Sequence, residues 1–204
     1  MSTQKKMKIF AFTDTHGNIK YIDKIIEKIE KNPVDYVLCC GDITNFGRKQ
    51  KEIVAKISKI PSKILLIHGN HEIPDGLSKD CEKFDNITFL HCSAFRDNSS
   101  LFFGYGGDGF SSQDSTFRKI SQKFSKDIKK NDKVILFFHG PPYKTLDRTF
   151  SGNSGNKDYR KFIEKIKPEY VFCGHIHEEF EKKSSIEKTR IINPGPEGMF
   201  FEIQ

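Results

Sequence analysis

Short apolar runs alternate with segments of helical period along the first third of this chain. The runs occupy residues 9–13, 36–40 and 63–67, and each is short enough to be a single buried strand. After the first run, isoleucines recur at i, i+3, i+4 and i+7, the spacing of one helix face: Ile22, Ile25, Ile26 and Ile29. Pro61 ends a second segment of this kind. Strands that alternate with helices predict a mixed α/β fold in which helices cover a parallel sheet.

The remainder of the chain is less regular. Strands are predicted at 87–90, 101–105, 134–138 and 170–173, with three short ones near Phe180, Ile191 and Phe201. Helical spacing recurs through Phe117, Ile120, Phe124 and Ile128, and again through Tyr159, Phe162, Ile163 and Ile166. A long polar loop, 141–156, precedes the second of these helices. No repeat or linker divides the sequence, so we expect a single domain over residues 1–204.

Composition favours a folded protein from a reducing compartment. Apolar residues make up 36% of the chain and charged residues 30%, and the two are interspersed, which argues against disorder. The five cysteines include no CxxC pair, which argues against a disulfide framework and against a thiolate zinc site. No apolar run is long enough for a signal sequence or a membrane span. We therefore expect a cytoplasmic protein with no membrane partner.

The formal net charge of +7 comes mainly from lysine. Such a balance fits an anionic substrate, a nucleic acid, or simply a solvated lysine-rich surface. No basic stripe with interleaved aromatic residues is present, so nucleic acid is not the favoured partner. The charge supports a small anionic substrate but does not identify one, and a solvated surface explains it equally well.

Polar residues follow five of the predicted strands directly. The five blocks are Asp14-Thr15-His16, Gly41-Asp42, Gly69-Asn70-His71-Glu72, His139-Gly140 and Gly174-His175-Ile176-His177. A lone Asp after a strand is usually a turn former, and a lone His is usually a surface residue. Here five of the seven histidines lie in these blocks, while His68 and His91 do not. Because the carboxyl ends of parallel strands converge on one edge, the blocks predict one shared site.

The mixture of residue types indicates metal binding. Imidazole nitrogens with carboxylate and amide oxygens, and without thiolates, suit divalent Mn, Fe, Zn or Ni. One ion needs only three or four of these groups, so seven candidate ligands favour two ions that share a carboxylate. Such a pair lowers the pKa of a bridging water, so that hydroxide exists at neutral pH, and it neutralises charge on phosphoryl oxygens.

The ordered set Asp-x-His, Gly-Asp, Gly-Asn-His-Glu, His-Gly and Gly-His-x-His resembles the calcineurin-like metallophosphoesterase superfamily. It extends from residue 14 to residue 177, most of the chain. The compact length and the His-Gly-Pro-Pro-Tyr stretch resemble its small stand-alone prokaryotic, particularly archaeal, branch. The resemblance implies a four-layer αββα sandwich with a dinuclear metal site at the carboxyl ends of the central strands. It also implies hydrolysis of small phosphoesters, with Mn as the first choice of metal.

Carried over by position, the resemblance gives each block a role. The first ion would be held by Asp14, His16 and His177, the second by Asn70, His139 and His175, and both by the bridging Asp42. His71 would not be a ligand but would contact the phosphate and protonate the leaving oxygen, which suits a group that titrates near neutral pH. Glu72 would either hold the ring of His71 or serve the structure alone.

The substrate class follows from a departure from one branch of the superfamily. The protein Ser/Thr phosphatases carry Arg at the positions that Phe46 and His68 occupy here. A phosphomonoester is dianionic near neutral pH and gains more from such cations than a diester does. We therefore expect diesters to be favoured, with Phe46 against the second ester group. Arg148 or Lys144 of the polar loop are the other candidates for substrate contacts.

Two alternatives differ in class. The first is a DNA or RNA nuclease of the same superfamily, which the basic charge permits, although those proteins add a capping domain. The second is a non-catalytic interaction scaffold with this fold. Degenerate members lose ligands or the acid histidine, whereas every one of these residues is present here.

Overall fold

The computed structural model describes residues 6–107 and 109–203. One sheet has the spatial order β13 (Met199–Ile203), β1 (Met7–Phe12), β2 (Tyr36–Cys39), β3 (Lys63–Leu66) and β4 (Ile87–Phe89). The other has the order β11 (Lys182–Ile186), β12 (Thr189–Asn193), β10 (Tyr170–Phe172), β7 (Lys133–Phe138), β6 (Ser100–Tyr105) and β5 (Ser93–Asp97). Within each sheet the central strands are parallel, so their carboxyl ends lie on one edge.

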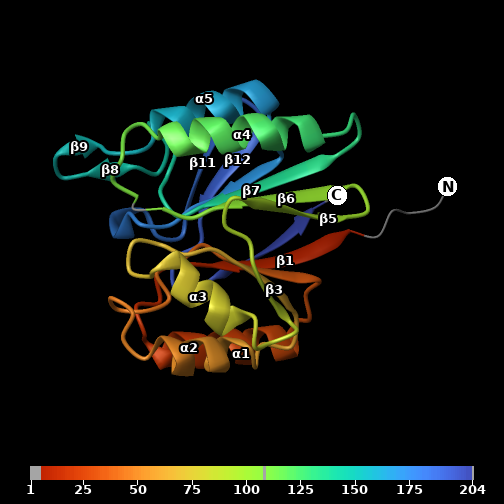
Figure 1. Cartoon of the computed structure of the whole chain (residues 1–204), viewed down its shortest axis with the longest axis vertical. Helices are drawn as coiled ribbons and strands as arrows, with labels where there is room; N and C mark the ends of the chain where they lie inside the picture. Colours follow the sequence, from red (N-terminus) through yellow and green to blue (C-terminus); the bar gives the residue numbers. More distant parts are fainter. Residues whose placement is uncertain (1–5, 108, 204) are drawn as a thin grey trace.

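Helices cover the outer face of each sheet (Figure 1). The helices are α1 (Ile19–Lys31), α2 (Gln50–Ile57), α3 (Pro74–Cys81), α4 (Ser115–Asp127) and α5 (Lys157–Ile166). In Figure 1, α1, α2 and α3 lie against the first sheet and α4 and α5 against the second, with the two sheets between them. The four-layer αββα sandwich is therefore confirmed. The parallel pairing predicted from the strand–helix alternation is confirmed for β1, β2 and β3, and both sheets also carry antiparallel strands at their edges.

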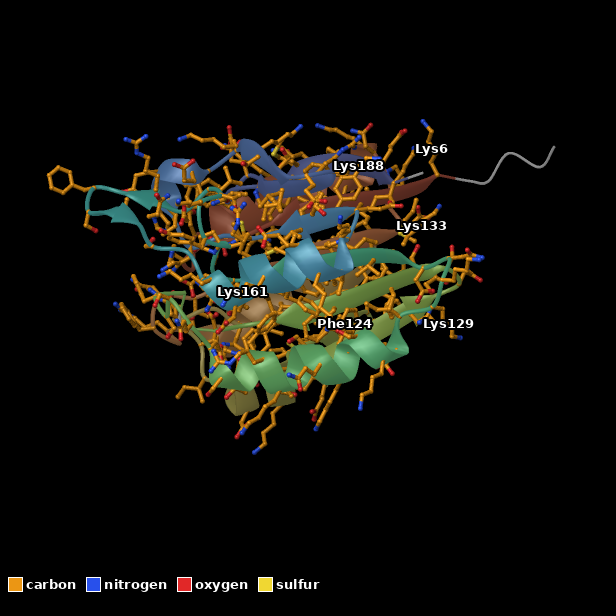
Figure 2. The ribbon with its side chains drawn as sticks, turned by 90° about the horizontal axis from the view of Figure 1, so that it is seen from above. Lys6, Phe124, Lys129, Lys133, Lys161 and Lys188 are labelled. Atoms are coloured by element: carbon orange, nitrogen blue, oxygen red, sulfur yellow. The ribbon has the colours of Figure 1, made fainter. Side chains whose placement is uncertain are left out.

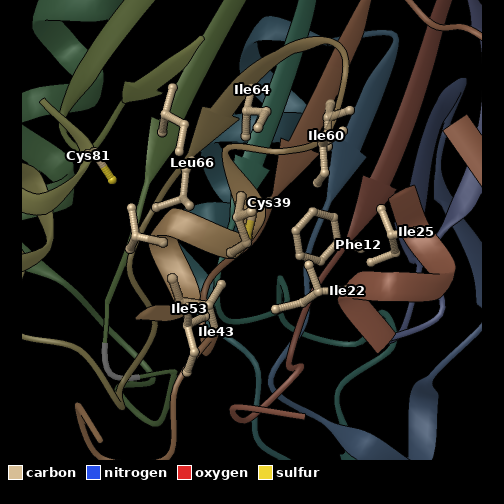
Figure 3. Close-up of a cluster of buried hydrophobic side chains, with 14 of the residues drawn as sticks. Phe12, Ile22, Ile25, Cys39, Ile43, Ile53, Ile60, Ile64, Leu66 and Cys81 are labelled. Carbon is tan, nitrogen blue, oxygen red and sulfur yellow. The ribbon is translucent and has the colours of Figure 1, made fainter. Parts of the chain in front are cut away.

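Three clusters of buried side chains lie between the four layers of helices and sheets and hold them together. Strand residues alternate between faces, so Phe10 and Phe12 of β1 point to the helices, while Ile9 and Ala11 point to the other sheet. Figure 3 shows part of the outer layer under α1 and α2. The layer between the sheets includes three phenylalanines from the second sheet: Phe102, Phe137 and Phe172.

Helix α1 illustrates how the sequence pattern produces a layer. Asn18 caps its first turn by accepting a hydrogen bond from the backbone N–H of Lys20 at 3.1 Å. Its buried residues are Ile22, Ile25 and Ile29, the spacing seen in the sequence. Burying one such side chain contributes about 1.5–3 kcal/mol. Among the described residues, no helix is long and apolar enough to cross a membrane.

Candidate metal centre

The five polar blocks meet where the two sheets present their carboxyl edges. The loops after β1, β2 and β3 bring Asp14, His16, Asp42, Asn70 and His71, and those after β7 and β10 bring His139, His175 and His177. These loops are bonded to one another through the backbone. Asp14 N donates to Gly41 O at 3.0 Å, and His16 N donates to Asp42 O at the same distance. In the second sheet, Gly174 N donates to His139 O at 2.8 Å.

Four of these residues have a left-handed backbone although none is glycine. Their φ angles are 54° for Asp14, 45° for His16, 50° for Asp42 and 69° for His175. Residues with a Cβ seldom adopt this conformation, and where it persists it is often found at functional sites. The loops are thus held in a shape that turns these side chains toward one another.

The glycines of two blocks are required by close approach. An added Cβ at Gly69 would overlap Oδ1 of Asp42, and one at Gly174 would overlap Oδ2 of Asp14. Only a residue without a side chain lets the carboxylates lie against the neighbouring loops. The Gly-Asn and Gly-His pairs of the sequence therefore have a steric origin.

Gly174→Ala is expected to displace Asp14 and to lower the occupancy of a divalent ion in the centre. Metal analysis after dialysis against Mn²⁺ measures this. Gly76→Ala is the matched control, because a Cβ there would meet only Gln50 Nε2 at 3.7 Å. In the α3 interior, alanine should raise the unfolding free energy by about 0.5–1 kcal/mol. Full occupancy in Gly174→Ala would contradict the assignment of Asp14 as a ligand.

Asp14, His16 and His177 converge on one point. Asp14 Oδ1 lies 3.8 Å from His16 Nε2 and 3.7 Å from His177 Nε2, and the two imidazole nitrogens are 3.1 Å apart. The other oxygen of Asp14 is already occupied, since it accepts from the Thr13 hydroxyl at 2.5 Å and from His175 N at 3.0 Å. These bonds orient the carboxylate so that Oδ1 faces the two rings.

A second convergence involves His139 and Asn70. His139 Nδ1 donates to the carbonyl of Cys40 at 2.9 Å, so in the neutral ring Nε2 carries only a lone pair. That nitrogen faces Asn70 Oδ1, also an acceptor, at 2.9 Å. Two acceptors at this distance are stabilised by a cation between them. The carbonyl behind the ring fixes the tautomer, as is common for metal-binding histidines.

Asp42 lies between these two groups. Its Oδ1 accepts from His71 N at 2.9 Å, which leaves Oδ2 directed into the site. Oδ2 lies 3.9 Å from His16 Nε2 and 3.6 Å from His139 Nε2, so one oxygen faces both groups. This is the position that a bridging carboxylate needs.

The protonation states suit a metal. Burial and the neighbouring His139 lower the pKa of His175 to about 4, and burial also lowers the pKa of His16. Burial alone would raise the pKa of Asp14, but His177 and other partners outweigh it and hold that pKa below its ordinary value. Contact with Asp14 in turn raises the pKa of His177. An ionised carboxylate and neutral imidazoles are the forms that bind metal ions, so the pKa shifts of Asp14, His16 and His175 favour binding, whereas an ion at His177 would compete with the proton of that ring.

Two buried atoms of the centre have no hydrogen-bond partner among the described residues, Asp14 Oδ1 and His175 Nε2. Leaving a buried polar group unpaired is unfavourable, so such atoms call for an unseen partner. Both atoms belong to candidate ligands, and both lie in a site rich in acceptors. The residues present therefore fit divalent metal ions.

His71 differs from the candidate ligands in its tautomer. The backbone N–H of Phe46 donates to His71 Nδ1 at 3.2 Å, so the proton of the neutral ring is on Nε2. His71 Nε2 lies 3.8 Å from Asp42 Oδ2 and therefore presents a donor where His139 presents a lone pair. The Phe46 ring stacks on the imidazole, with centroids 4.0 Å apart.

Glu72 does not bond the His71 ring. Its carboxylate accepts from the backbone N–H groups of Asp42, Thr44 and Gly69 at 3.1, 2.9 and 3.0 Å, and so ties two of the loops together. Of the two roles that the sequence left open for Glu72, the structure supports the structural one. The group that holds the His71 ring is a backbone N–H, which no sequence motif announces.

The described residues that line the pocket are His16, Asp42, Asn45, Asn70, His71, Phe110, His175 and His177. Two of them, Asn45 and Phe110, were missed because solvent exposure cannot be inferred from a loop sequence. Phe46, Lys144 and Arg148 are not part of this lining, although Phe46 contacts the site through His71. Lys144 Nζ instead lies 5.5 Å from the centre of the Tyr143 ring. Outside the pocket, His68 is buried and its Nδ1 donates to Gly69 O at 2.8 Å.

Comparison with known proteins agrees with the fold. The profile of the calcineurin-like phosphoesterase family matches residues 7–179, which include all five polar blocks. An uncharacterised protein of Methanocaldococcus jannaschii is 29% identical over 96% of this chain and 91% of its own length.

Two similar solved structures are from prokaryotes. A Thermus thermophilus protein superposes with a TM-score of 0.75 and 12% identity, over 94% of this chain and 90% of that one. An archaeal phosphodiesterase superposes with a TM-score of 0.51 and 18% identity, over 93% and 84% of the two chains. From the matched profile, which covers most of its length, the chain belongs to the calcineurin-like phosphoesterase family.

Proposed function

We propose that this protein is a phosphodiesterase that uses two divalent metal ions, Mn²⁺ first among them. The observation that carries the proposal is the pocket lining, in which no described residue is Lys or Arg. A solved structure of similar fold is itself an archaeal phosphodiesterase. A diester, with its single negative charge, matches a pocket without fixed cations better than a dianionic monoester does.

The side chains divide the chemistry among them. Ions held by the Asp, Asn and His ligands would lower the pKa of a water and neutralise charge on the phosphoryl oxygens. Asp42 directs Oδ2 toward both ligand groups and is kept there by the N–H of His71. His71 holds its proton on Nε2, the atom that faces the site, and donates a hydrogen bond from it to the leaving oxygen. In the hydrolysis, a bond forms between phosphorus and water oxygen while the bond to the leaving oxygen breaks.

Arg148 and Lys144, the two cationic residues of the polar loop that were expected to contact the substrate, do not line the pocket. That loop contains a short hairpin, β8 (Arg148–Thr149) with β9 (Gly152–Asn153), and Arg148 is exposed on it. The hairpin lies beside the turn of His177, at the metal end of the molecule (Figure 1). Figure 2 shows Lys6, Lys129 and Lys133 at the other end. These three lysines therefore lie away from the pocket.

The experiment compares kcat/KM for bis(p-nitrophenyl) phosphate with that for p-nitrophenyl phosphate under the same metal. A charged clamp is worth about 1.5–3 kcal/mol, so its absence should disfavour the monoester by about tenfold or more. A clear preference for the monoester would contradict the proposal. It would also identify Arg148 or Lys144 as the clamp, which Arg148→Ala and Lys144→Ala would then test.

A further inference from the structure

Large apolar side chains are exposed mainly at the metal end of the molecule. Among the described residues, the exposed ones are Ile19, Phe46, Ile73, Phe110, Phe150 and Phe200. All but Phe200 follow the carboxyl ends of parallel strands, Ile19 as the first residue of α1 and the others in loops between elements. Single exposed apolar residues are ordinary, but a concentration at the rim of a site indicates an apolar part of its ligand.

Two of these residues contact histidines of the centre. The Phe46 ring is 75% exposed and stacks on His71 at a centroid distance of 4.0 Å and an angle of 21°. The Phe110 ring is 70% exposed and stands edge to face with His175 at 4.2 Å and 83°. Phe46 follows a strand of the first sheet and Phe110 a strand of the second. The pocket is therefore flanked by one aromatic ring from each sheet.

The backbone holds Phe110 close to the metal ligand. Gly109, directly before it, has a φ of +75°, and an added Cβ there would lie 2.6 Å from the His175 ring. The chain thus passes against the His175 imidazole at Gly109, which has no side chain to obstruct the approach. The next residue, Phe110, places its ring on the pocket. Phe46 is also in a left-handed conformation, with a φ of +51°, although it has a bulky side chain. Such backbone conformations are unfavourable and persist where the surrounding structure imposes them.

We propose that Phe110 is the specificity-determining residue for the ester group that stays on the phosphate, and that this group carries a flat aromatic ring. The proposal rests on the phosphodiesterase function above. His71 donates to the leaving oxygen, so the leaving group lies on the Phe46 flank, where the sequence alone suggested the second ester group. The retained group then lies on the other flank, against Phe110. A flat ring stacks well on an exposed phenylalanine, and both aryl groups and nucleobases supply one.

The first test keeps the leaving group constant. The substrates are p-nitrophenyl diesters whose retained group is methyl, phenyl or thymidine, so that the bond that breaks is the same in each. Stacking of one ring changes affinity by about 5- to 100-fold. We expect Phe110→Ala to lower kcat/KM by such a factor for the phenyl or the thymidine ester and to leave the methyl ester nearly unchanged. The ester with the larger loss distinguishes an aryl group from a nucleoside.

Phe150→Ala is the matched control, because it removes an exposed phenylalanine of the hairpin. It should leave the ratio of phenyl to methyl ester unchanged. An equal loss on all three substrates in Phe110→Ala, or no loss at all, would overturn the proposal.

The second test measures contact without catalysis. The chain contains no tryptophan, so Phe110→Trp and Phe150→Trp each introduce a single tryptophan, which can be excited apart from the six tyrosines. In protein loaded with Mn²⁺, diphenyl phosphate should change the emission of Trp at position 110 in a saturable way, and dimethyl phosphate should not. Emission that does not respond in Phe110→Trp, while diesters are still hydrolysed, overturns the aromatic subsite and leaves the phosphodiesterase proposal standing. A saturable response in a protein that hydrolyses no diester supports the subsite and rejects the activity.

Discussion

Removal of divalent metal with a chelator is expected to abolish phosphoester hydrolysis, and addition of Mn²⁺ is expected to restore it. The centre consists of groups that repel one another without a cation. Asp14 Oδ1 is buried without a hydrogen-bond partner, and His139 Nε2 faces the Asn70 oxygen at 2.9 Å. No Lys or Arg in the described pocket lining supplies positive charge to a phosphoryl group. Hydrolysis by the metal-free protein should therefore fall to the rate of the uncatalysed reaction.

Thermal unfolding provides a second measure of the same binding. An ion that binds the folded chain alone, at a hundred times its Kd, adds about 2.7 kcal/mol to the unfolding free energy. The melting temperature should consequently rise with Mn²⁺ concentration and fall after chelation. Mg²⁺ serves as the control, because it prefers oxygen ligands and its own waters to imidazole. Full activity in protein shown by metal analysis to be metal-free would end the metal-dependent mechanism.

His71→Ala is expected to lower kcat by about 10²- to 10⁴-fold, the usual contribution of a general acid, while the metal stays bound. The Phe46 N–H directs the His71 proton to Nε2, so the ring lacks the lone pair that a ligand would offer there. Distance alone does not separate the two roles. His71 Nε2 lies 3.8 Å from Asp42 Oδ2, comparable with the 3.6 Å of His139 Nε2.

Asp42→Asn should behave differently, because one oxygen of Asp42 faces both ligand groups. We expect it to lose metal as well as activity. Asp80→Asn is the control for removal of a buried carboxylate, since Asp80 lies on α3 and bonds Lys83 and Gln50. It should keep both metal and rate. Loss of metal in His71→Ala together with retention in Asp42→Asn would reverse the two assignments.

The elements that sequence patterning predicted are those with strong periodicity. Helix α1 buries three isoleucines at helical spacing, and its existence and inward face were predicted. Helix α3 was missed, because its buried residues are only Leu77, Asp80 and Cys81, too few apolar residues to show a period. Strand β5 was missed for the corresponding reason, since none of its residues is fully buried. Weak burial leaves little trace in a sequence, whichever element is formed.

The hairpin β8–β9 was not predicted from the sequence, for a different reason. The segment 141–156 is polar and was predicted to be a loop, yet Arg148 pairs with Asn153 and Thr149 with Gly152. The hairpin is organised by Asp147, whose Oδ1 accepts from the Asn153 amide at 2.6 Å. Polar bonding of this kind has no hydrophobic period to detect. The strand expected near Phe180 begins at Lys182, after the short turn of His177.

For the site, the order of the polar blocks predicted which residues come together, but not what orients them. Thr13 bonds Asp14, the carbonyl of Cys40 fixes His139, and the N–H of Phe46 fixes His71. The last two of these partners are backbone groups, which every residue has. Their positions depend on the folded loops, so they could be found only in three dimensions. The metal-ligand roles themselves remain predictions that the experiments above address.

The two sheets have a further connection through the centre. With the ligands assigned as above, Asp14 and His16 of the first sheet would share one ion with His177 of the second sheet. Asn70 of the first sheet would share the other ion with His139 and His175 of the second, and Asp42 would bind both ions. Each ion would then link the two sheets at their shared carboxyl edge. Its affinity would depend on their separation, which the phenylalanines between them set. A change such as Phe102→Leu, in that inter-sheet layer and remote from every ligand in the sequence, would be felt as weaker metal binding. Selection for metal binding and selection for a well-packed interior would therefore favour the same residues between the two sheets.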